Sequence, residues 1–240
     1  RCQLGQSLAR RGGTLYNRLV IYQLYEPRGD DMLQVGIIGY GGRISGMAKG
    51  LAMYGIPYRI AAIADPRAEE IRQGNDPILQ DTHFYQDADA MLAAERDLDG
   101  VMVGTRCFLH TEMACKVAAR RLPLFLEKPV AITFDQVKQL DANFRDYPAP
   151  VVVSFPLRLT PMVQTVKQLI DADTIGTVEH VVAFNDVPYG DVYYYAWYRN
   201  YDQVGGLFLQ KATHDLDYIY YLLGQKPRSL CAMNARRIYG

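Results

Sequence analysis

Short apolar runs alternate with amphipathic segments between residues 33 and 155. The runs have the length of strands buried on both faces, and the intervening segments have the length of helices. The pattern predicts strands near 35–38 and at 59–64, 99–103, 123–126 and 151–155, with helices at 44–54, 66–74, 87–96, 109–121 and 134–145. Asp87 and Thr133 are predicted to cap two of the helices. This alternation predicts an α/β fold with a doubly wound parallel sheet, whose ligands lie beyond the carboxyl ends of the strands.

The pattern changes after Phe155. Helices are predicted at 161–171 and 213–223, strands at 177–187 and 228–238, and a tyrosine-rich loop at 189–201. Two strands and two helices do not make a stable sheet domain alone. We therefore predict an α+β domain with an open sheet that is incomplete here. The predicted organisation is an extension of doubtful status at 1–31, a first domain at 32–156 and a partial second domain at 157–240.

A glycine-rich turn joins the first predicted strand to its helix. It contains Gly39, Gly41 and Gly42, but Ile44 stands where the pattern G-x-G-x-x-G asks for a third small residue. We expect Gly46 to relieve crowding between helix and strand instead. Glycines at such a turn let backbone N–H groups approach a pyrophosphate, and Asp65, about two dozen residues further on, is placed to accept hydrogen bonds from a ribose. Dinucleotide binding is the functional interpretation, and a purely structural turn is the alternative.

Composition excludes several classes of protein. The chain has 240 residues, 49% of them hydrophobic, so it can fill one large core or two ordinary ones. Its formal net charge of +0 gives no support to nucleic-acid or membrane-surface binding. No apolar run approaches the roughly 20 residues of a membrane span. The scattered cysteines lack the C-x-x-C spacing of metal or redox sites, so we expect reduced thiols, a cytoplasmic location and no bound metal.

Residues 1–31 show no sustained hydrophobic period, and Met32 falls immediately before the first predicted strand. We interpret Met32 as the natural start. The twin arginines Arg10 and Arg11 suggest an export signal, but 19–22 is too short for its apolar region and no cleavage site follows. Export is therefore not the favoured interpretation.

Four segments together carry a family resemblance: Gly39–Arg43, Asp65, the tripeptide EKP at Glu127–Pro129, and GGLFLQKATHDLD at Gly205–Asp217. In this combination the chain resembles the Gfo/Idh/MocA oxidoreductases from Met32 to its end. The resemblance implies an N-terminal Rossmann domain that holds NAD or NADP. It also implies a C-terminal open-sheet domain that presents a sugar, cyclitol or related polyol to the nicotinamide. Members of that family are considerably longer, so this chain resembles one that stops within the second domain.

Lys128 and His214 are the predicted catalytic residues. By the family pattern Lys128 holds a substrate hydroxyl or relays a proton, and His214 takes the hydroxyl proton as hydride leaves. The alternatives are a surface lysine paired with Glu127 and a structural histidine. One departure affects the pair. Inositol-dehydrogenase-like members have an aspartate four residues before the histidine, whereas this chain has Gln210 followed by Lys211.

The resemblance and the glycine turn together predict a cofactor-binding set. The nucleotide is expected to contact Gly39, Tyr40, Gly41, Gly42, Arg43, Ile44, Asp65, Arg67, Thr105, His110, Glu127 and Lys128. Asp65 favours NAD because a carboxylate repels a 2′-phosphate. Arg43 and Arg67 stand close enough in the sequence to leave NADP open.

A second predicted set binds substrate. Its members are Lys128, Arg158, Trp197, Arg199, Gln210, Lys211 and His214. Trp197 is the single tryptophan and lies in the tyrosine-rich loop. Aromatic faces can stack on the C–H faces of sugars. A wall that packs domains or subunits together explains the loop equally well.

The functional prediction is an NAD(P)-dependent oxidoreductase that acts on a secondary alcohol of a sugar or polyol. A redox-neutral enzyme that oxidises a sugar transiently to cleave a glycoside is one alternative. A non-catalytic NAD-binding sensor is another, and an inactive truncated chain is a third. We expect a homo-oligomer for the full-length protein, with no nucleic-acid or membrane partner.

Overall fold

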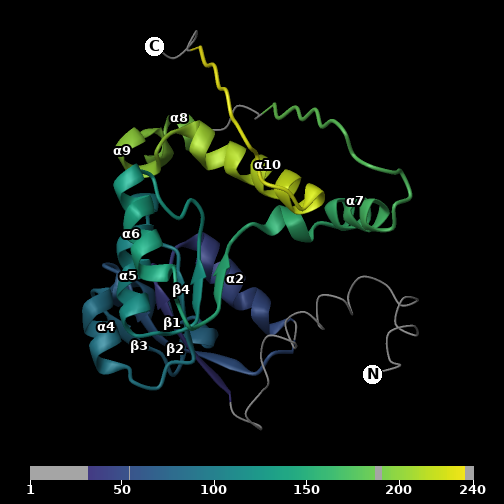
Figure 1. Cartoon of the computed structure of the whole chain (residues 1–240). Helices are drawn as coiled ribbons and strands as arrows, with labels where there is room; N and C mark the ends of the chain where they lie inside the picture. Colours follow the sequence, from purple (N-terminus) through teal and green to yellow (C-terminus); the bar gives the residue numbers. More distant parts are fainter. Residues whose placement is uncertain (1–31, 54, 187–190, 236–240) are drawn as a thin grey trace, which may run out of the picture. The chain divides into compact units, whose positions relative to one another are not determined.

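The computed structural model describes residues 32–53, 55–186 and 191–235 (Figure 1). The predicted extension at 1–31 lies outside these residues. A six-stranded sheet has the order β3-β2-β1-β4-β5-β6, and each neighbouring pair is parallel. The strands are β1 (Leu33–Ile38), β2 (Tyr58–Ala64), β3 (His83–Tyr85), β4 (Gly100–Val103), β5 (Leu124–Leu126) and β6 (Val151–Val153). The predicted doubly wound parallel sheet is confirmed.

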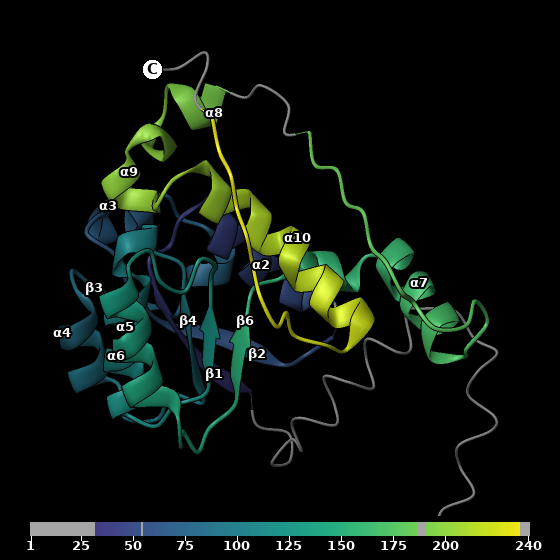
Figure 2. The ribbon, with the colours of Figure 1, turned by 45° about the horizontal axis from the view of Figure 1, so that its top comes forward.

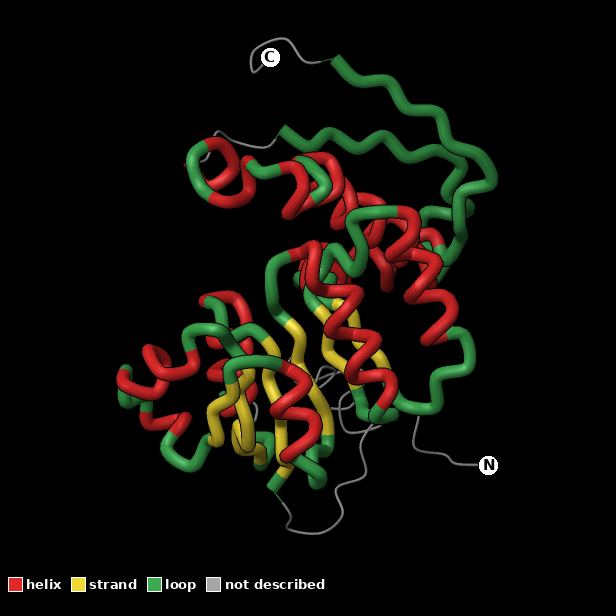
Figure 3. Tube along the Cα trace, turned by 90° about the vertical axis from the view of Figure 1, so that its left-hand side faces the viewer, coloured by secondary structure: helices red, strands yellow, loops and turns green. Residues whose placement is uncertain are grey.

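Helices lie on both faces of this sheet, as Figure 3 shows. They are α2 (Gly42–Ala52), α3 (Ala68–Gln73), α4 (Ala88–Ala94), α5 (His110–Ala119) and α6 (Phe134–Phe144). Successive strand residues point to opposite faces. Ile37 therefore packs with the α2 residues Ile44 and Ala48, whereas Ile38 packs in a second core with Met91 of α4 and other residues. Helices α5 and α6 lie side by side (Figure 2).

Local sequence signals account for the helix ends. The Asp87 side chain accepts a hydrogen bond from the Ala90 N–H at the start of α4. Thr133 caps α6 in the same way through the Gln136 N–H. Both predicted N-caps are confirmed. Further along the chain, helix α10 (Leu207–Leu223) ends at the predicted residue, and Gly224 follows it with φ of 63°.

The structure departs from the prediction after Phe155. Helix α7 (Pro161–Asp171) is confirmed, but residues 177–186 and 228–235 carry no strand, so the two strands predicted there are wrong over the described part. A strand exists only when another strand supplies its hydrogen-bond partners. Within the described residues these two segments have no such partner.

Three further differences concern individual elements. The tyrosine-rich segment, predicted to be a loop, forms α8 (Asp191–Tyr194), the 3-10 helix η4 (Trp197–Arg199) and α9 (Tyr201–Val204). Strand β3 was not predicted at all. Helix α10 also begins six residues before the predicted start at 213, and this extension brings Gln210 into a helix.

The described residues fall into two compact units. One contains the whole sheet, up to Ser154, together with residues 191–210. The other contains residues 155–186 and 211–235. None of the helices among the described residues has the length and apolar character needed to cross a membrane.

Candidate functional site

The turn after β1 is built for close approach of the backbone. Gly39 adopts φ of +84°, and a Cβ at this position would lie 2.8 Å from the Thr105 backbone nitrogen, so a side chain is excluded. Gly41 caps α2 without a side-chain hydrogen bond, and α2 has no acidic residue in its first turn. Open space lies where the Cβ atoms of Gly41 and Gly42 would be. The first turn of α2 therefore offers N–H donors and a positive dipole end to an anion.

The missing third glycine is compensated from another strand. Ile44 is fully buried on α2, and a Cβ added to Gly104, just after β4, would lie only 1.8 Å from the Ile44 Cγ1. Gly104 therefore makes the space that Ile44 fills. The expectation that Gly46 relieves this crowding is wrong, because Gly46 is exposed on α2 and no atom lies within 4 Å of its Cβ position.

Asp65 joins two turns at the carboxyl edge of the sheet. It follows β2 and is 5% exposed. Its Oδ2 accepts from the Tyr40 N–H at 2.9 Å, and its Oδ1 accepts from the Arg67 N–H at 2.9 Å. The Arg67 guanidinium lies against the same carboxylate, with Nε 3.3 Å from Oδ1. The acid and the arginine that bear on NAD or NADP preference are thus paired with each other.

The acid of EKP connects β5 to the glycine turn. Glu127 is 6% exposed, and its Oε1 accepts from the Arg43 Nε at 3.0 Å. An Arg43 terminal nitrogen also lies 3.5 Å from the hydroxyl of Ser154, which follows β6. Arg43 therefore links the first turn of α2 to the ends of β5 and β6. Ser154 was not singled out from the sequence, although its place after an apolar strand is the available signal.

Lys128 is bound to the first turn of α10. Its Nζ donates to the main-chain oxygen of Gln210 at 2.8 Å and lies 3.4 Å from the Gln210 Oε1. Gln210 is 2% exposed, and its Nε2 donates to the Val204 carbonyl at 2.9 Å and to the Cys107 Sγ at 3.3 Å. The peptide bond between Lys128 and Pro129 is cis. Predicted residues far apart in the sequence thus meet here.

His110 holds two loops of this edge together. It is 2% exposed, with Nδ1 2.7 Å from the Pro129 oxygen and Nε2 3.1 Å from the Thr105 oxygen. Burial lowers the pKa of His110 and outweighs the two carbonyl contacts, which favour the protonated ring. The side chain of His110 therefore bonds to the protein's own main chain and orders the loops after β4 and β5.

Aromatic residues of the segment 191–201 contact one another and Arg106. The Arg106 guanidinium carbon lies 4.0 Å from the Trp197 ring centroid, and the Tyr198 ring lies 4.0 Å from the same ring. Burial raises the pKa of the Tyr198 hydroxyl. A sugar that stacks on the ring face covered by Arg106 must first displace that guanidinium. Arg199 is exposed.

The second unit contains its own cluster of predicted residues. Arg158 donates from Nε to the Asp217 Oδ2 at 2.6 Å and from a terminal nitrogen to the other carboxylate oxygen. Asp217 is 8% exposed. The His214 ring meets Phe155 edge-on at 5.7 Å, and Lys211 lies on the same helix, α10. Lys128 and His214 belong to different units, so their joint role in catalysis stays a prediction.

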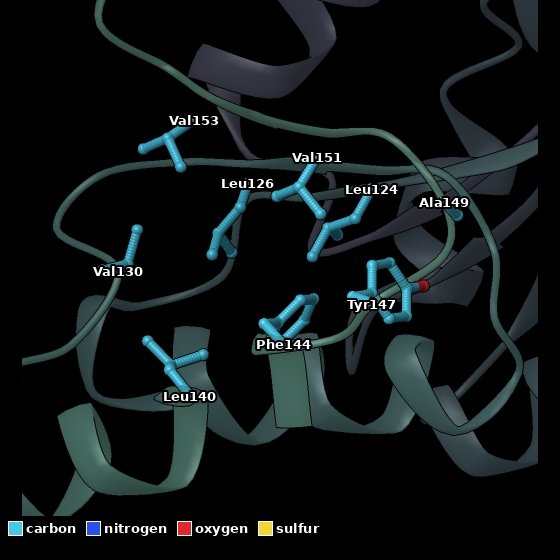
Figure 4. A pocket seen from close by; sticks show the side chains of 9 residues that line it. All are labelled: Leu124, Leu126, Val130, Leu140, Phe144, Tyr147, Ala149, Val151 and Val153. Atoms are coloured by element: carbon cyan, nitrogen blue, oxygen red, sulfur yellow. The ribbon is translucent and has the colours of Figure 1, made fainter. Parts of the chain in front are cut away.

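One apolar pocket among the described residues lies apart from the candidate residues. The pocket in Figure 4 has a volume of about 330 Å³ and lies between α6 and the β5–β6 edge. Its lining is apolar and aromatic, and it includes none of the candidate residues. Among the described residues, no group of three or more histidines, cysteines or acids is arranged to hold a metal ion.

Comparison with known proteins matches both parts of the chain. Residues 33–155 match the family model described as "Oxidoreductase family, NAD-binding Rossmann fold". Residues 163–240 match the GFO/IDH/MocA C-terminal domain.

Individual relatives agree with these matches. Inositol 2-dehydrogenase of Rhizobium meliloti is 28% identical over 60% of this chain and 42% of its own length. The WlbA dehydrogenase of Bordetella pertussis, solved with NADH and UDP-GlcNAcA, has a TM-score of 0.68 at 25% identity, covering 82% of this chain and 57% of that one. Scyllo-inositol dehydrogenase of Lactobacillus casei, solved with NAD(H) and scyllo-inositol, has a TM-score of 0.70 at 20% identity, covering 81% and 57%. The chain spans about half the length of the curated relatives it matches.

Proposed function

Because the chain belongs to the GFO/IDH/MocA oxidoreductase family, we propose that the whole protein transfers a hydride between NAD and a secondary alcohol of a sugar, cyclitol or related polyol. One observation carries the proposal. Lys128 stands at the carboxyl end of β5, held by α10, and its neighbour Glu127 bonds to Arg43 on the glycine-turn helix. Lys128, a cation that can bind a hydroxyl, is therefore held at the carboxyl edge of the sheet, where the dinucleotide is proposed to bind.

The first unit fits NAD. The pyrophosphate would be held by the first-turn N–H groups of α2 beside Gly41 and Gly42, where open space is present. The adenosine ribose would be bound by Asp65, whose carboxylate favours a 2′-hydroxyl over a 2′-phosphate. When bound, the nicotinamide supplies the acceptor for the hydride. Arg67 pairs with Asp65, so NADP binding would require that guanidinium to turn outward.

Lys128 is proposed to bind the substrate hydroxyl and to stabilise the oxygen as negative charge develops on it. His214 is proposed to take the hydroxyl proton, since histidine is the side chain whose unperturbed pKa suits proton transfer at neutral pH. Arg158, fixed by Asp217, is proposed to border the substrate. The names of relatives that act on inositols support a cyclitol or a similar polyol as substrate. A cytoplasmic homo-oligomer is part of the same proposal.

The test uses the complete protein with a panel of polyols and glycosides, with NAD and with NADP. Nicotinamide absorbance and product identity are followed together. We expect net NADH formation from at least one polyol. Lys128→Met should lower kcat by about 10²–10³, the cost of removing one group that stabilises a developing oxyanion.

The matched control is Lys138→Met, because Lys138 is an exposed lysine of α6 paired with Asp135. It should leave kcat within about twofold, since exposed ion pairs contribute little. Product formation without net NADH would favour the redox-neutral alternative. NAD binding with no turnover, and no effect of Lys128→Met on the protein's biological activity, would favour a sensor.

A further inference from the structure

We propose that Gln210 is a positioning residue: its main-chain and side-chain oxygens hold Lys128 in place, and its uncharged amide favours the ammonium form of Lys128 less than a carboxylate at position 210 would. In this proposal Gln210 does not itself bind substrate. The catalytic consequence rests on the function proposed above. The contacts that carry the inference lie within the first unit of the described chain.

The orientation of the Gln210 amide is determined by its neighbours. Its Nε2 lies 2.9 Å from the Val204 carbonyl oxygen and 3.3 Å from the Cys107 Sγ. An amide oxygen cannot donate to that carbonyl, so the nitrogen must take this side. The Oε1 consequently faces the Lys128 Nζ at 3.4 Å. At 2% exposure, water has little access to compete for these bonds.

The side-chain bonds also place the main chain of Gln210. Val204 is the last residue of α9, and Cys107 begins the 3-10 helix η2 (Cys107–Leu109). Anchored to both, the first turn of α10 holds the Gln210 carbonyl oxygen 2.8 Å from the Lys128 Nζ. The shorter and stronger contact to the lysine is therefore made by backbone that the side chain fixes.

The neutrality of this anchor has a chemical consequence. A carboxylate beside an amine favours the ammonium form, whereas an amide does so much less. With an amide at position 210, a larger fraction of Lys128 is therefore in the neutral amine form than it would be with an acid there. The two isosteric replacements Gln210→Glu and Gln210→Met therefore have opposite expected effects on the lysine, because one adds charge and the other removes the polar anchor.

Competitive acylation of the complete protein with acetic anhydride measures the effect without any substrate. Only the neutral amine reacts, and peptide mass spectrometry gives the rate at Lys128 relative to the exposed Lys138. We expect Gln210→Glu to slow Lys128 by about tenfold or more, since a neighbouring charge shifts such an equilibrium by one unit or more. Gln210→Met should speed it several-fold. If Gln210 had a purely structural role, the two variants would change the labelling rate of Lys128 in the same direction or not at all. Either result would overturn the proposal.

Thermal unfolding monitored by circular dichroism shows whether each variant folds. If Gln210→Glu does not fold, Gln210→Met decides alone: an unchanged labelling rate would refute the proposal. In turnover assays Gln210→Met should lower kcat about tenfold with a smaller change in KM. If labelling follows the expectation while the wild-type protein oxidises no polyol, the proposed function fails and the positioning role stands.

Discussion

Gly104→Ala tests the packing of Gly104 against Ile44, the residue that stands where the glycine-rich turn after β1 lacks its third glycine. The added Cβ would lie 1.8 Å from the Ile44 Cγ1, 2.7 Å from its Cδ1 and 3.1 Å from its Cβ. Gly104 lacks a positive φ, so the backbone tolerates alanine and the strain is steric alone. Ile44 is fully buried among Ile37, Ile60 and other core residues, which leaves it little room to move.

Overpacking of a tight core costs about 1–3 kcal/mol, and a contact this short places Gly104→Ala at about 3 kcal/mol. Urea unfolding followed by circular dichroism measures the loss. The matched control is Gly46→Ala, where no atom lies within 4 Å of the added Cβ. Because Gly46 is exposed inside α2, alanine there should stabilise the protein by about 0.5–1 kcal/mol.

A double-mutant cycle identifies Ile44 as the cause. Ile44→Ala alone should cost about 2–5 kcal/mol through the cavity it leaves. Combined with Gly104→Ala, the total should fall short of the sum of the single losses by about 1–3 kcal/mol, since alanine at 104 partly fills that cavity. If Gly104→Ala changed stability by less than about 0.5 kcal/mol, the packing argument would be refuted.

Two further predictions concern the site. Asp65→Ser should weaken NAD binding about tenfold or more, because a charged hydrogen-bond acceptor worth about 1.5–3 kcal/mol is lost. The same change releases Arg67 and should therefore reduce the preference for NAD over NADP. Calorimetric titration with each cofactor measures both effects. His110 has a lowered pKa in the fold, so its contribution is present above the unfolded pKa of about 6.5 and is lost as pH falls below it. Urea unfolding at pH about 7.5 and about 5.5 should show a larger acid loss for the wild type than for His110→Asn, and equal losses would contradict this.

Local signals in the sequence predicted much of the first unit. Continuous apolar runs such as the one ending at Val103 identify buried strands. Asp87 and Thr133 mark the starts of two helices because their side chains can accept a hydrogen bond from the first-turn N–H groups, as they do in the structure. Strand β3 (His83–Tyr85) escaped prediction because it begins with the exposed His83 and has no continuous apolar run, unlike the equally short β6. The predicted strand at 177–187 illustrates the opposite error, since β-propensity cannot supply a partner.

Contacts between distant residues set the limit on predicting the site. The pairing of Arg43 with Glu127 and of Lys128 with Gln210 joins residues 84 and 82 positions apart. Residue types and strand ends predicted that Asp65, Glu127 and Lys128 lie at the carboxyl edge of the sheet, but not that Gln210 turns its amide oxygen toward Lys128. That detail depends on where α10 begins, and Gly205 and Gly206, both at positive φ, precede that start.

Hydride transfer from a deuterated polyol tests the central claim most directly. The complete protein is incubated with NAD and a cyclitol deuterated at each carbinol carbon, and the reduced nicotinamide is analysed by mass spectrometry. We predict one deuterium per reduced nicotinamide in the wild type and a loss of about 10²–10³ in its rate of formation with Lys128→Met. Reduced cofactor without deuterium, or a Lys128→Met rate equal to the wild type, would contradict the account.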